Sequence, residues 1–255
     1  MAIPRAMTPL VWQSASRTDQ GRVRKLNEDT ILDEVANHLW CVADGMGGHE
    51  SGEVASQLIA RTLGRVKPLP HLADAVDKID ETLRAVNQAL FDRGAAKGKL
   101  MGATVVVALA RQDLLALLWA GDSRAYLFRG NTCYPLTRDH TQLEAMLESG
   151  EVRPEDAAGH TAARVVTRAV GAAEELVLDI EMIRAEPGDW FILCSDGVGK
   201  HVEDAELASF VGGENPSAVI DHLIDTVLAR GGIDNVSVIA LNAQASTETV
   251  TAVPH

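Results

Sequence analysis

The chain has 255 residues, of which 46% are hydrophobic and 23% charged, a balance typical of a globular domain that can bury a core. The formal net charge of −13 argues against a nucleic-acid-binding or anionic-membrane-binding protein, because both need a basic face. No run is long and apolar enough to cross a bilayer, and residues 1–14 lack the apolar stretch of a secretory signal. We therefore expect a cytoplasmic protein without membrane insertion. Attachment to a membrane complex through a partner protein stays open.

The first half of the chain predicts a buried strand followed by two helices. Residues 38–45, HLWCVADG, form a short apolar run that ends at Asp44. Apolar residues at helical spacing then predict amphipathic helices over 50–66 and 71–91. The apolar stripe of the second helix resembles that of a coiled coil but is short, so we expect it to pack on a sheet.

The second half predicts mainly hairpins. Strands over 103–110 and 114–121 and strands over 124–130 and 132–137 are each joined by a short turn. The polar segment 138–164 reads as an insertion over the body. The remaining predicted elements are a strand over 175–183 with one apolar face, a strand over 190–197, a helix over 216–230 and a strand over 235–242.

Hairpins dominate and strand–helix–strand alternation is absent, so the fold class is α+β with mainly antiparallel sheets covered by helices. The sequence contains no internal repeat and no low-complexity linker. We expect one domain over residues 1–242 and a disordered tail over 243–255, which is rich in small and polar residues.

Acidic residues interrupt the apolar runs where predicted strands reach an edge. Most of them have a glycine beside them or close by, and the set consists of Glu28, Asp29, Asp44, Asp122, Asp196 and Asp234. A single Asp-Gly pair usually marks only a turn. Several such acids at strand ends favour a shared site, provided that the ends converge.

Carboxylates that share a small volume raise one another's pKa and destabilise the fold unless a cation compensates them. Few Lys or Arg residues lie next to these acids in the sequence, so a divalent ion is the expected compensation. Carboxylate and carbonyl oxygens suit Mg²⁺ or Mn²⁺, whereas the His and Cys clusters typical of zinc sites are missing. The carbonyl of Gly45, directly after Asp44, is a further oxygen donor, and the bare glycines would leave room for waters and a substrate.

Other motifs point less directly to chemistry. Arg24 precedes Glu28 and could bind a phosphate with its guanidinium, although an arginine at such a position is more often a surface residue. The three cysteines, Cys41, Cys133 and Cys194, show no CxxC spacing and read as free thiols in a reducing compartment. The glycines after Asp44 are not a P-loop, because no Gly-Lys-Ser/Thr follows them.

In order along the chain, several motifs resemble the metal-dependent protein serine/threonine phosphatases of type 2C, in particular the bacterial branch. The matching pieces run from about Gly21 to Leu241 and are GRVRKLNEDT, VADGMGGHESGEVAS, GATVVVALA, WAGDSRAYLFRG, LTRDHT, VVTRAVG, GDWFILCSDGV and GGIDNVSVIAL. DGMGG, GDSRAY, SDG and DNVSV in series are a highly specific signal.

The resemblance implies a sandwich of antiparallel β-sheets flanked by helix pairs, with a metal centre at one end and a variable flap at 138–164. It also implies the ligand roles. Asp44 would bridge two Mn²⁺ or Mg²⁺ ions, the Gly45 carbonyl would bind one, and Asp196 and Asp234 the other. A weaker third ion would lie between Asp122 and Asp196.

For the substrate side, the resemblance implies that Arg24 grips the phosphate, while Glu28 acts through a metal-bound water with Asp29 in support. Water bridging the two core ions would attack the phosphorus of phosphoserine or phosphothreonine. Many eukaryotic members have a histidine directly after the Asp-Gly pair as the proposed general acid, but this chain has Met46. A metal-bound water is the first choice for the acid, and His49 and His160 are alternatives.

We expect a monomer that acts on a phosphorylated protein, which could be a Ser/Thr kinase or one of its targets. Two alternatives stay open. A two-metal phosphodiesterase or nuclease would also cluster carboxylates, although the acidic balance weighs against nucleic acid. A non-catalytic module with a decayed site is the other, but such a chain should have lost Asp44, Asp196 or Asp234, and all three are present.

Overall fold

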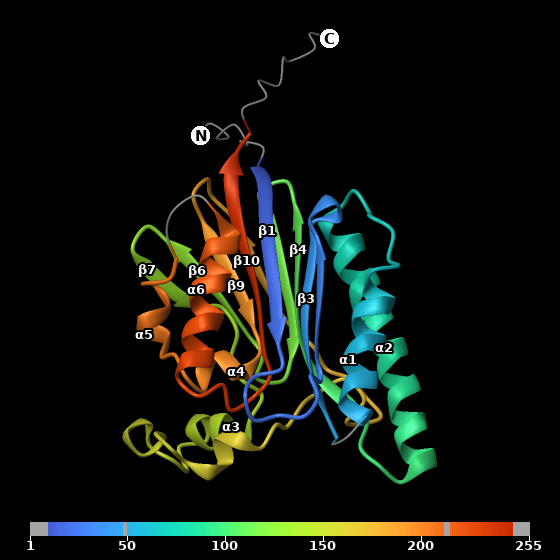
Figure 1. Ribbon diagram of the computed structural model, residues 1–255. Coiled ribbons are helices and arrows are strands. Elements are labelled where there is room, and N and C mark those ends of the chain that lie inside the picture. The colour runs from blue at the N-terminus through green and yellow to red at the C-terminus, as the bar shows by residue number, and fades with distance from the viewer. Residues whose placement is uncertain (1–9, 48–49, 212–214, 247–255) are drawn as a thin grey trace.

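The computed structural model describes residues 10–47, 50–211 and 215–246, and in this part of the chain two antiparallel sheets pack face to face (Figure 1). Each sheet has five strands, as the predicted α+β sandwich requires. In spatial order, the first sheet consists of β1 (Leu10–Asp19), β10 (Val236–Ala245), β9 (Trp190–Cys194), β6 (Arg124–Arg129) and β7 (Thr132–Pro135). The second sheet consists of β2 (Asp29–Glu34), β3 (Leu39–Met46), β4 (Gly102–Arg111), β5 (Leu114–Ala120) and β8 (Asp179–Arg184).

Helices cover the outer face of each sheet (Figure 1). The second sheet is covered by the long pair α1 (Glu50–Leu63) and α2 (Leu72–Lys97). The first sheet is covered by α6 (Pro216–Ala229) with the short helices α4 (Asp196–Gly199) and α5 (Asp204–Leu207), so this side has one long helix rather than a pair. The flap contains α3 (Gln142–Glu148) and the 3-10 turns η2 (Pro154–Asp156) and η3 (Thr161–Arg164), and η1 (Val35–Asn37) joins β2 to β3.

The core has three layers because both sheets bury both faces. Between the sheets, the ring of Trp12 lies 5.6 Å from that of Trp40 and 5.8 Å from that of Phe191. Along β4, Val106 faces this layer while Val105 and its alternate neighbours face α1 and α2. Each large apolar side chain buried in this way stabilises the fold by roughly 1.5–3 kcal/mol. The predicted packing of the 71–91 helix on a sheet is thus confirmed.

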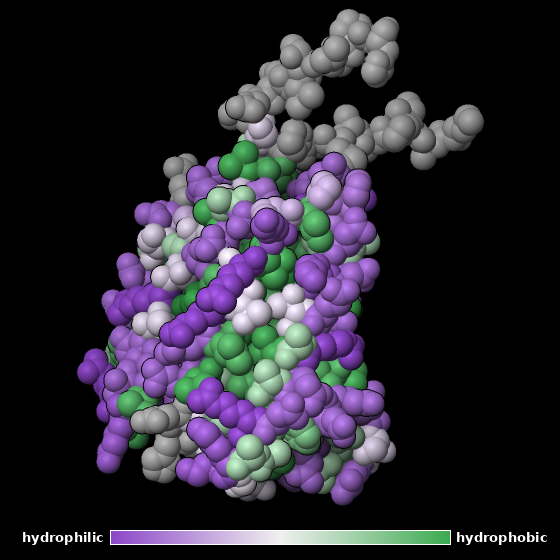
Figure 2. Space-filling model, turned by 90° about the vertical axis from the view of Figure 1, so that its right-hand side faces the viewer, coloured by the Kyte–Doolittle hydropathy of each residue, from purple (hydrophilic) through white to green (hydrophobic). Residues whose placement is uncertain are grey.

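The face formed by α1 and α2 is viewed in Figure 2, which shows apolar side chains gathered between hydrophilic ones. Partly buried Leu58, Leu69 and Val76 belong to this layer and pack against the core below. No helix in the described ranges is long and apolar enough to cross a membrane.

Three expectations about elements need correction. No strand is predicted over residues 10–19, yet β1 pairs with β10 along its whole length, from Leu10 opposite Ala245 to Asp19 opposite Val236. This pairing carries β10 three residues into the expected tail, whose residues 247–255 lie outside the described ranges.

The predicted strand 175–183 begins only at Asp179, and the apolar face predicted for it is not buried there. Leu176 is buried before the strand begins, but Ile180 and Met182 are about half exposed, at 47% and 49%. The reason is the position of β8 at the edge of the second sheet, where it pairs with β5 alone.

Candidate metal centre

The antiparallel topology brings the acidic strand ends to one end of the sandwich. Strands β3 and β5 run in the same direction, because each pairs antiparallel with β4 between them, so Asp44 and Asp122 emerge at the same end. The end of β9 lies beside the start of β10, which places Asp196 near Asp234. The loop from β1 to β2 carries Arg24 and Glu28 past the same end.

These ends surround a cavity of about 960 Å³. Seven of the eight residues predicted for the site line it, namely Arg24, Glu28, Asp44, Gly45, Asp122, Asp196 and Asp234. Ala163 and Arg164 of the flap, Val165 and Val166 directly after it, and Met46 also line the cavity. The predicted convergence of scattered acids is therefore what the fold produces.

Asp29 is the exception, because it lies behind the cavity rather than on its wall. It is 6% exposed and is paired with Asp44 across β2 and β3. Its Oδ2 accepts hydrogen bonds from the hydroxyls of Ser195 and Ser237, both at 2.8 Å. Burial raises the pKa of Asp29 to about 6, with these hydrogen bonds opposing the shift. Asp29 is therefore adjacent to Asp44 but does not line the cavity.

The bare backbone after Asp44 is explained mainly by packing of the chain on itself. The Gly45 amide donates to the Glu28 carbonyl at 3.1 Å, and a Cβ on Gly45 would lie 2.3 Å from the Gly52 carbonyl oxygen at the start of α1. Gly47 has a φ of +120°, where a side chain would be strained. The room predicted for waters and substrate is thus filled, at Gly45, by the loop before β2 and by α1.

Two carboxyl groups of the cavity have strongly raised pKa values. Loss of hydration and the nearby charges of Asp29 and Asp196 raise the pKa of Asp44 well above its usual value. Burial, together with the charge of Asp196, raises the pKa of Asp122 to about 7. Neither side chain contacts a basic group in the described part of the chain. The protein alone therefore holds these acids in a state in which ionisation is unfavourable.

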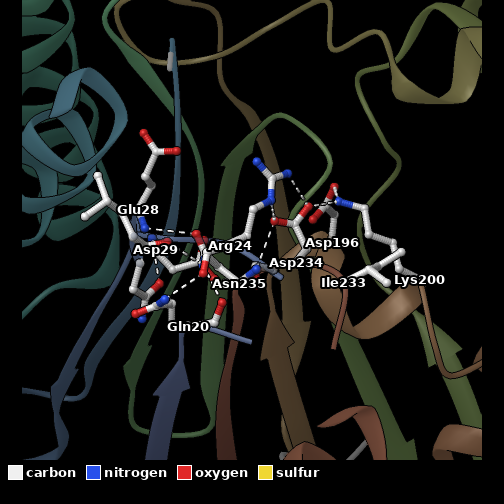
Figure 3. Close-up of polar contacts among 12 residues, drawn as sticks. Gln20, Arg24, Glu28, Asp29, Asp196, Lys200, Ile233, Asp234 and Asn235 are labelled. Carbon is white, nitrogen blue, oxygen red and sulfur yellow. Dashed lines mark hydrogen bonds and ion pairs between the residues drawn. The ribbon is translucent and has the colours of Figure 1, made fainter. Parts of the chain in front are cut away.

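Asp196 and Asp234 are in a different state, because basic side chains contact them (Figure 3). The Lys200 ammonium lies 2.5 Å from Asp196 Oδ2 and 2.6 Å from Asp234 Oδ2. Arg24 holds Asp234 with two bonds, from Nη2 at 2.8 Å and from Nε at 2.7 Å. Burial alone would raise the pKa of Asp234, but hydrogen bonds from Lys200 and Arg24 outweigh it and lower the pKa.

Lys200 was not predicted as part of the site, because only basic residues directly next to the acids in the sequence were considered and Lys200 lies four residues after Asp196. The available signal was the spacing, since Lys200 follows Asp196 by four residues and one turn of helix places them on the same face. A four-residue helix such as α4 leaves no periodic pattern by which it could be predicted.

Asn235 is a second residue that sequence reasoning missed. Its side-chain amide donates to the carbonyls of Gln20 and Leu26, and its Oδ1 accepts from the Glu28 amide at 2.9 Å. The asparagine thereby fixes the loop that carries Arg24 and Glu28 against Asp234. The motif DNVSV contained this residue, but nothing in the sequence indicated that it was an anchor.

The flap end of the cavity is neutralised by the protein itself. Arg124 makes a two-pronged ion pair with Asp139, with both N–O distances at 2.8 Å. Of the two histidines considered as the general acid, His49 lies outside the described ranges. His160 accepts from the Ala162 amide through Nδ1 on the flap and is not among the residues that line the cavity.

The donor set fits a hard divalent cation in chemistry, although the side chains as oriented do not form a closed cage. No three Asp, Glu, His or Cys side chains of residues 10–47, 50–211 and 215–246 are grouped as ion ligands. Asp196 and Asp234 turn toward Lys200 instead. All the donors are oxygens, and Glu28 Oε1 and Asp29 Oδ1 are buried without a hydrogen-bond partner in the structure. A bound cation would give Glu28 Oε1 a partner and would favour the ionised form of Asp44.

Comparisons with known proteins place this arrangement in a family. The family pattern of protein phosphatase 2C matches residues 14–145. Serine/threonine phosphatase stp of Listeria monocytogenes is 32% identical over 233 residues, which cover 88% of this chain and 92% of stp. The chain belongs to the protein phosphatase 2C family. Serine/threonine protein phosphatase PstP of Mycobacterium tuberculosis is 34% identical over 92% of this chain, which spans about half of PstP, 45% of its length.

Solved structures of the protein phosphatase 2C family agree with the fold. PppA, described as a key regulatory component of T6SS in Pseudomonas aeruginosa, is 38% identical with a TM-score of 0.87, covering 92% of this chain and 99% of that one. The catalytic domain of PstP in complex with two manganese ions is 32% identical with a TM-score of 0.81 and covers the same shares. The predicted family and sandwich are confirmed.

Proposed function

We propose that this chain is a protein serine/threonine phosphatase that hydrolyses phosphoserine and phosphothreonine with two Mn²⁺ or Mg²⁺ ions. The observation that carries the proposal is the cavity at the end of the sandwich, where Asp44 and Asp122 contact no basic side chain in the described structure and have raised pKa values. The Ser/Thr phosphatase names of PstP and stp, and the two manganese ions in the PstP structure, support the same function.

The residues that would hold the ions follow from the cavity wall. Asp44 would contact both core ions, with the Gly45 carbonyl, Asp196 and Asp234 completing the protein ligands. Asp122 lies beside Asp196 at the position expected for a weaker third ion, and Glu28 would contribute through its orphaned Oε1. When bound, the ions would activate the attacking water and neutralise charge on the phosphate.

Residues of the chain itself would position the metal ligands and bind the phosphate of the substrate. Asn235 holds the loop that carries Arg24 and Glu28 in place. The Arg24 side chain is 51% exposed, so its guanidinium can reach a phosphate as well as Asp234. Asp29 keeps Asp44 in position from behind, as a positioning residue.

The proton for the departing serine or threonine oxygen would come from water. No histidine lines the cavity within the described ranges, and Met46 occupies the position after the Asp-Gly pair. Asp139 and Arg164 of the flap line the cavity, so the flap would contact the peptide around the phosphorylated residue.

The substrate would be a phosphorylated protein, for example a Ser/Thr kinase or a target of one, and the enzyme would act as a cytoplasmic monomer. PppA supports a role in regulation, because it is described as a regulatory component of a secretion system. The net charge of −13 disfavours nucleic acid as a substrate.

The test is turnover of a phosphothreonine peptide, single-stranded DNA and RNA, each with chelator and then with Mn²⁺ or Mg²⁺ restored. We expect hydrolysis of the peptide alone, its loss with chelator and its recovery with either ion. Cleavage of DNA or RNA would favour the two-metal nuclease. No turnover of any substrate with Mn²⁺ or Mg²⁺ present would favour the non-catalytic module.

A further inference from the structure

Lys200 stands out because its ammonium lies where the proposed function requires a metal ion. Its Nζ contacts the Oδ2 atoms of Asp196 and Asp234, at 2.5 and 2.6 Å, and both aspartates line the cavity (Figure 3). A divalent ion held by these two aspartates needs oxygens of the same carboxylates. The ammonium and the ion therefore compete for one pair of ligands.

The Lys200 side chain can move into and out of its position between Asp196 and Asp234 while its backbone stays fixed. Helix α4 fixes the backbone of Lys200 one turn after Asp196, and the Lys200 amide donates to the Asp196 carbonyl at 3.1 Å. The side chain is 33% exposed, so it borders solvent at its outer end. Lysine carries a compact charge on a flexible four-carbon stem, which allows the ammonium to swing away without a change in the backbone.

An ion pair on the protein surface differs from the Lys200 contacts in its exposure to solvent and in its place in the fold. Lys78 and Glu81 on α2 are 3.0 Å apart, but their side chains are 52% and 68% exposed and neither lines the cavity at the end of the sandwich. Such exposed pairs contribute little to stability. Lys200 instead bridges two carboxylates that are 28% and 14% exposed and line the same cavity as Asp44 and Asp122, whose pKa values its charge also lowers.

We propose that Lys200 is an internal counter-cation of the metal-free site, which an incoming divalent ion must displace from Asp196 and Asp234. The inference rests on the proposed two-metal function and adds a residue that controls the loading of the site. Lys200 thus stabilises the metal-free protein and at the same time weakens metal binding. A lysine with a merely structural role would stabilise both forms alike.

The experiment compares wild type with two neutral variants, K200M and K200Q, with K200R, which keeps the charge, and with the matched control K78M. Mn²⁺ affinity is measured by calorimetric titration of chelator-stripped protein. Thermal unfolding is measured in chelator and in saturating Mn²⁺. The two readouts do not depend on turnover, so they separate metal loading from activity.

The neutral variants should bind Mn²⁺ about tenfold more tightly than wild type, a difference of about 1.4 kcal/mol. In chelator they should melt about 2–4 °C lower than wild type, and in saturating Mn²⁺ they should melt at the same temperature or higher. K200R should behave like wild type in chelator, and K78M should match wild type in both readouts.

Equal or weaker Mn²⁺ binding by both neutral variants would overturn the inference and leave the two-metal proposal intact. Loss of folding by both neutral variants with and without Mn²⁺ would make Lys200 structural and would also overturn it. Mn²⁺ binding by K200M but not by wild type would support the inference in its strongest form. Absence of Mn²⁺ binding from wild type and all variants would refute both the inference and the proposed function.

Discussion

Two aspartates at strand ends, Asp44 and Asp189, look alike in sequence and differ in the structure. Each adjoins a glycine at the edge of an apolar strand, Asp44 near the end of β3 and Asp189 just before β9. Asp189 accepts from Arg129 at 2.6 and 2.8 Å and from the Glu186 amide at 2.7 Å. Asp44 contacts no basic side chain in the described structure, and burial together with the charges of neighbouring aspartates raises its pKa.

The comparison teaches that the position of an acid at a strand end does not define a site. What distinguishes the two is whether the protein supplies the counter-charge. Arg129 completes Asp189, so this residue has a structural role at the turn between β8 and β9. Asp44 has no such partner in the described structure, and a bound cation would supply one, which is the physical basis of the proposed metal centre.

Replacing Asp44 should have the largest effect, because it removes the acid shared by both core ions. In Asp44→Asn, turnover of a phosphothreonine peptide should fall by about 10²–10³-fold or more, and Mn²⁺ binding should weaken. The metal-free variant should be at least as stable as wild type, since an unfavourable charge is gone. Steady-state kinetics and calorimetry check this, and unchanged hydrolysis would remove Asp44 from the site.

Replacing Asp189 should lower the stability of the fold and leave metal binding and activity unchanged. Asp189→Ala leaves Arg129 without its main partner, which should lower the free energy of unfolding by about 3 kcal/mol, the lower end of the range for breaking a buried pair, because Arg129 is 36% exposed. Urea unfolding measures the loss. Mn²⁺ affinity and kcat should stay at wild-type values, and a loss of Mn²⁺ binding would show that the contrast between the two aspartates is mistaken.

The raised pKa of Asp122 predicts how stability depends on pH in chelator. Its pKa is about 7 in the folded protein and near 4 in the unfolded chain, so the folded state holds the extra proton between these values. The contribution of Asp122 to stability is present at low pH and is lost as pH rises through 7. Asp122→Asn lacks this titration.

Relative to wild type, Asp122→Asn should therefore gain about 2–3 kcal/mol in unfolding free energy between pH 5 and pH 8. Taking the difference cancels the opposing contribution of histidines such as His38 and His140, whose pKa values are lowered by burial. Urea unfolding at both pH values checks it. A difference that stays constant with pH would mean that Asp122 is ionised throughout.

The smallest predicted effect concerns Arg24, which connects the cavity to the substrate. In Arg24→Ala, KM for the phosphopeptide should rise by about tenfold with a smaller change in kcat, because a ground-state contact to phosphate is lost. Arg24→Lys keeps the charge but loses the two-pronged contact to Asp234, so its KM should lie between those of wild type and Arg24→Ala. An unchanged KM would remove Arg24 from phosphate binding.

The convergence of the acids was predictable because hairpin order fixes which strand ends lie together. Asp44 and Asp122 share an end once β3, β4 and β5 are read as consecutive antiparallel strands. The missed strand β1 has small and polar residues after Trp12, and it is a strand because β10 pairs with it rather than because of its own pattern. Local pattern could not reveal that partner.

The counter-charges were harder to predict than the acids. Arg129 is 60 residues from Asp189, and Arg124 is 15 residues from Asp139, so only the folded chain shows these pairs. Lys200 was close enough in sequence to be found, through its spacing from Asp196, but only if the short helix α4 had been expected. Sequence therefore identified the acids and missed how the protein neutralises some of them.

The most direct test of the central claim is a crystal structure of the protein grown with Mn²⁺, with anomalous scattering recorded at the manganese absorption edge. We predict two anomalous peaks next to the Asp44 carboxylate, with the Lys200 ammonium no longer in contact with Asp196 and Asp234. A cavity without anomalous peaks, in which Lys200 still bridges the two aspartates at saturating Mn²⁺, would contradict the claim that this cavity takes its missing charge from divalent ions.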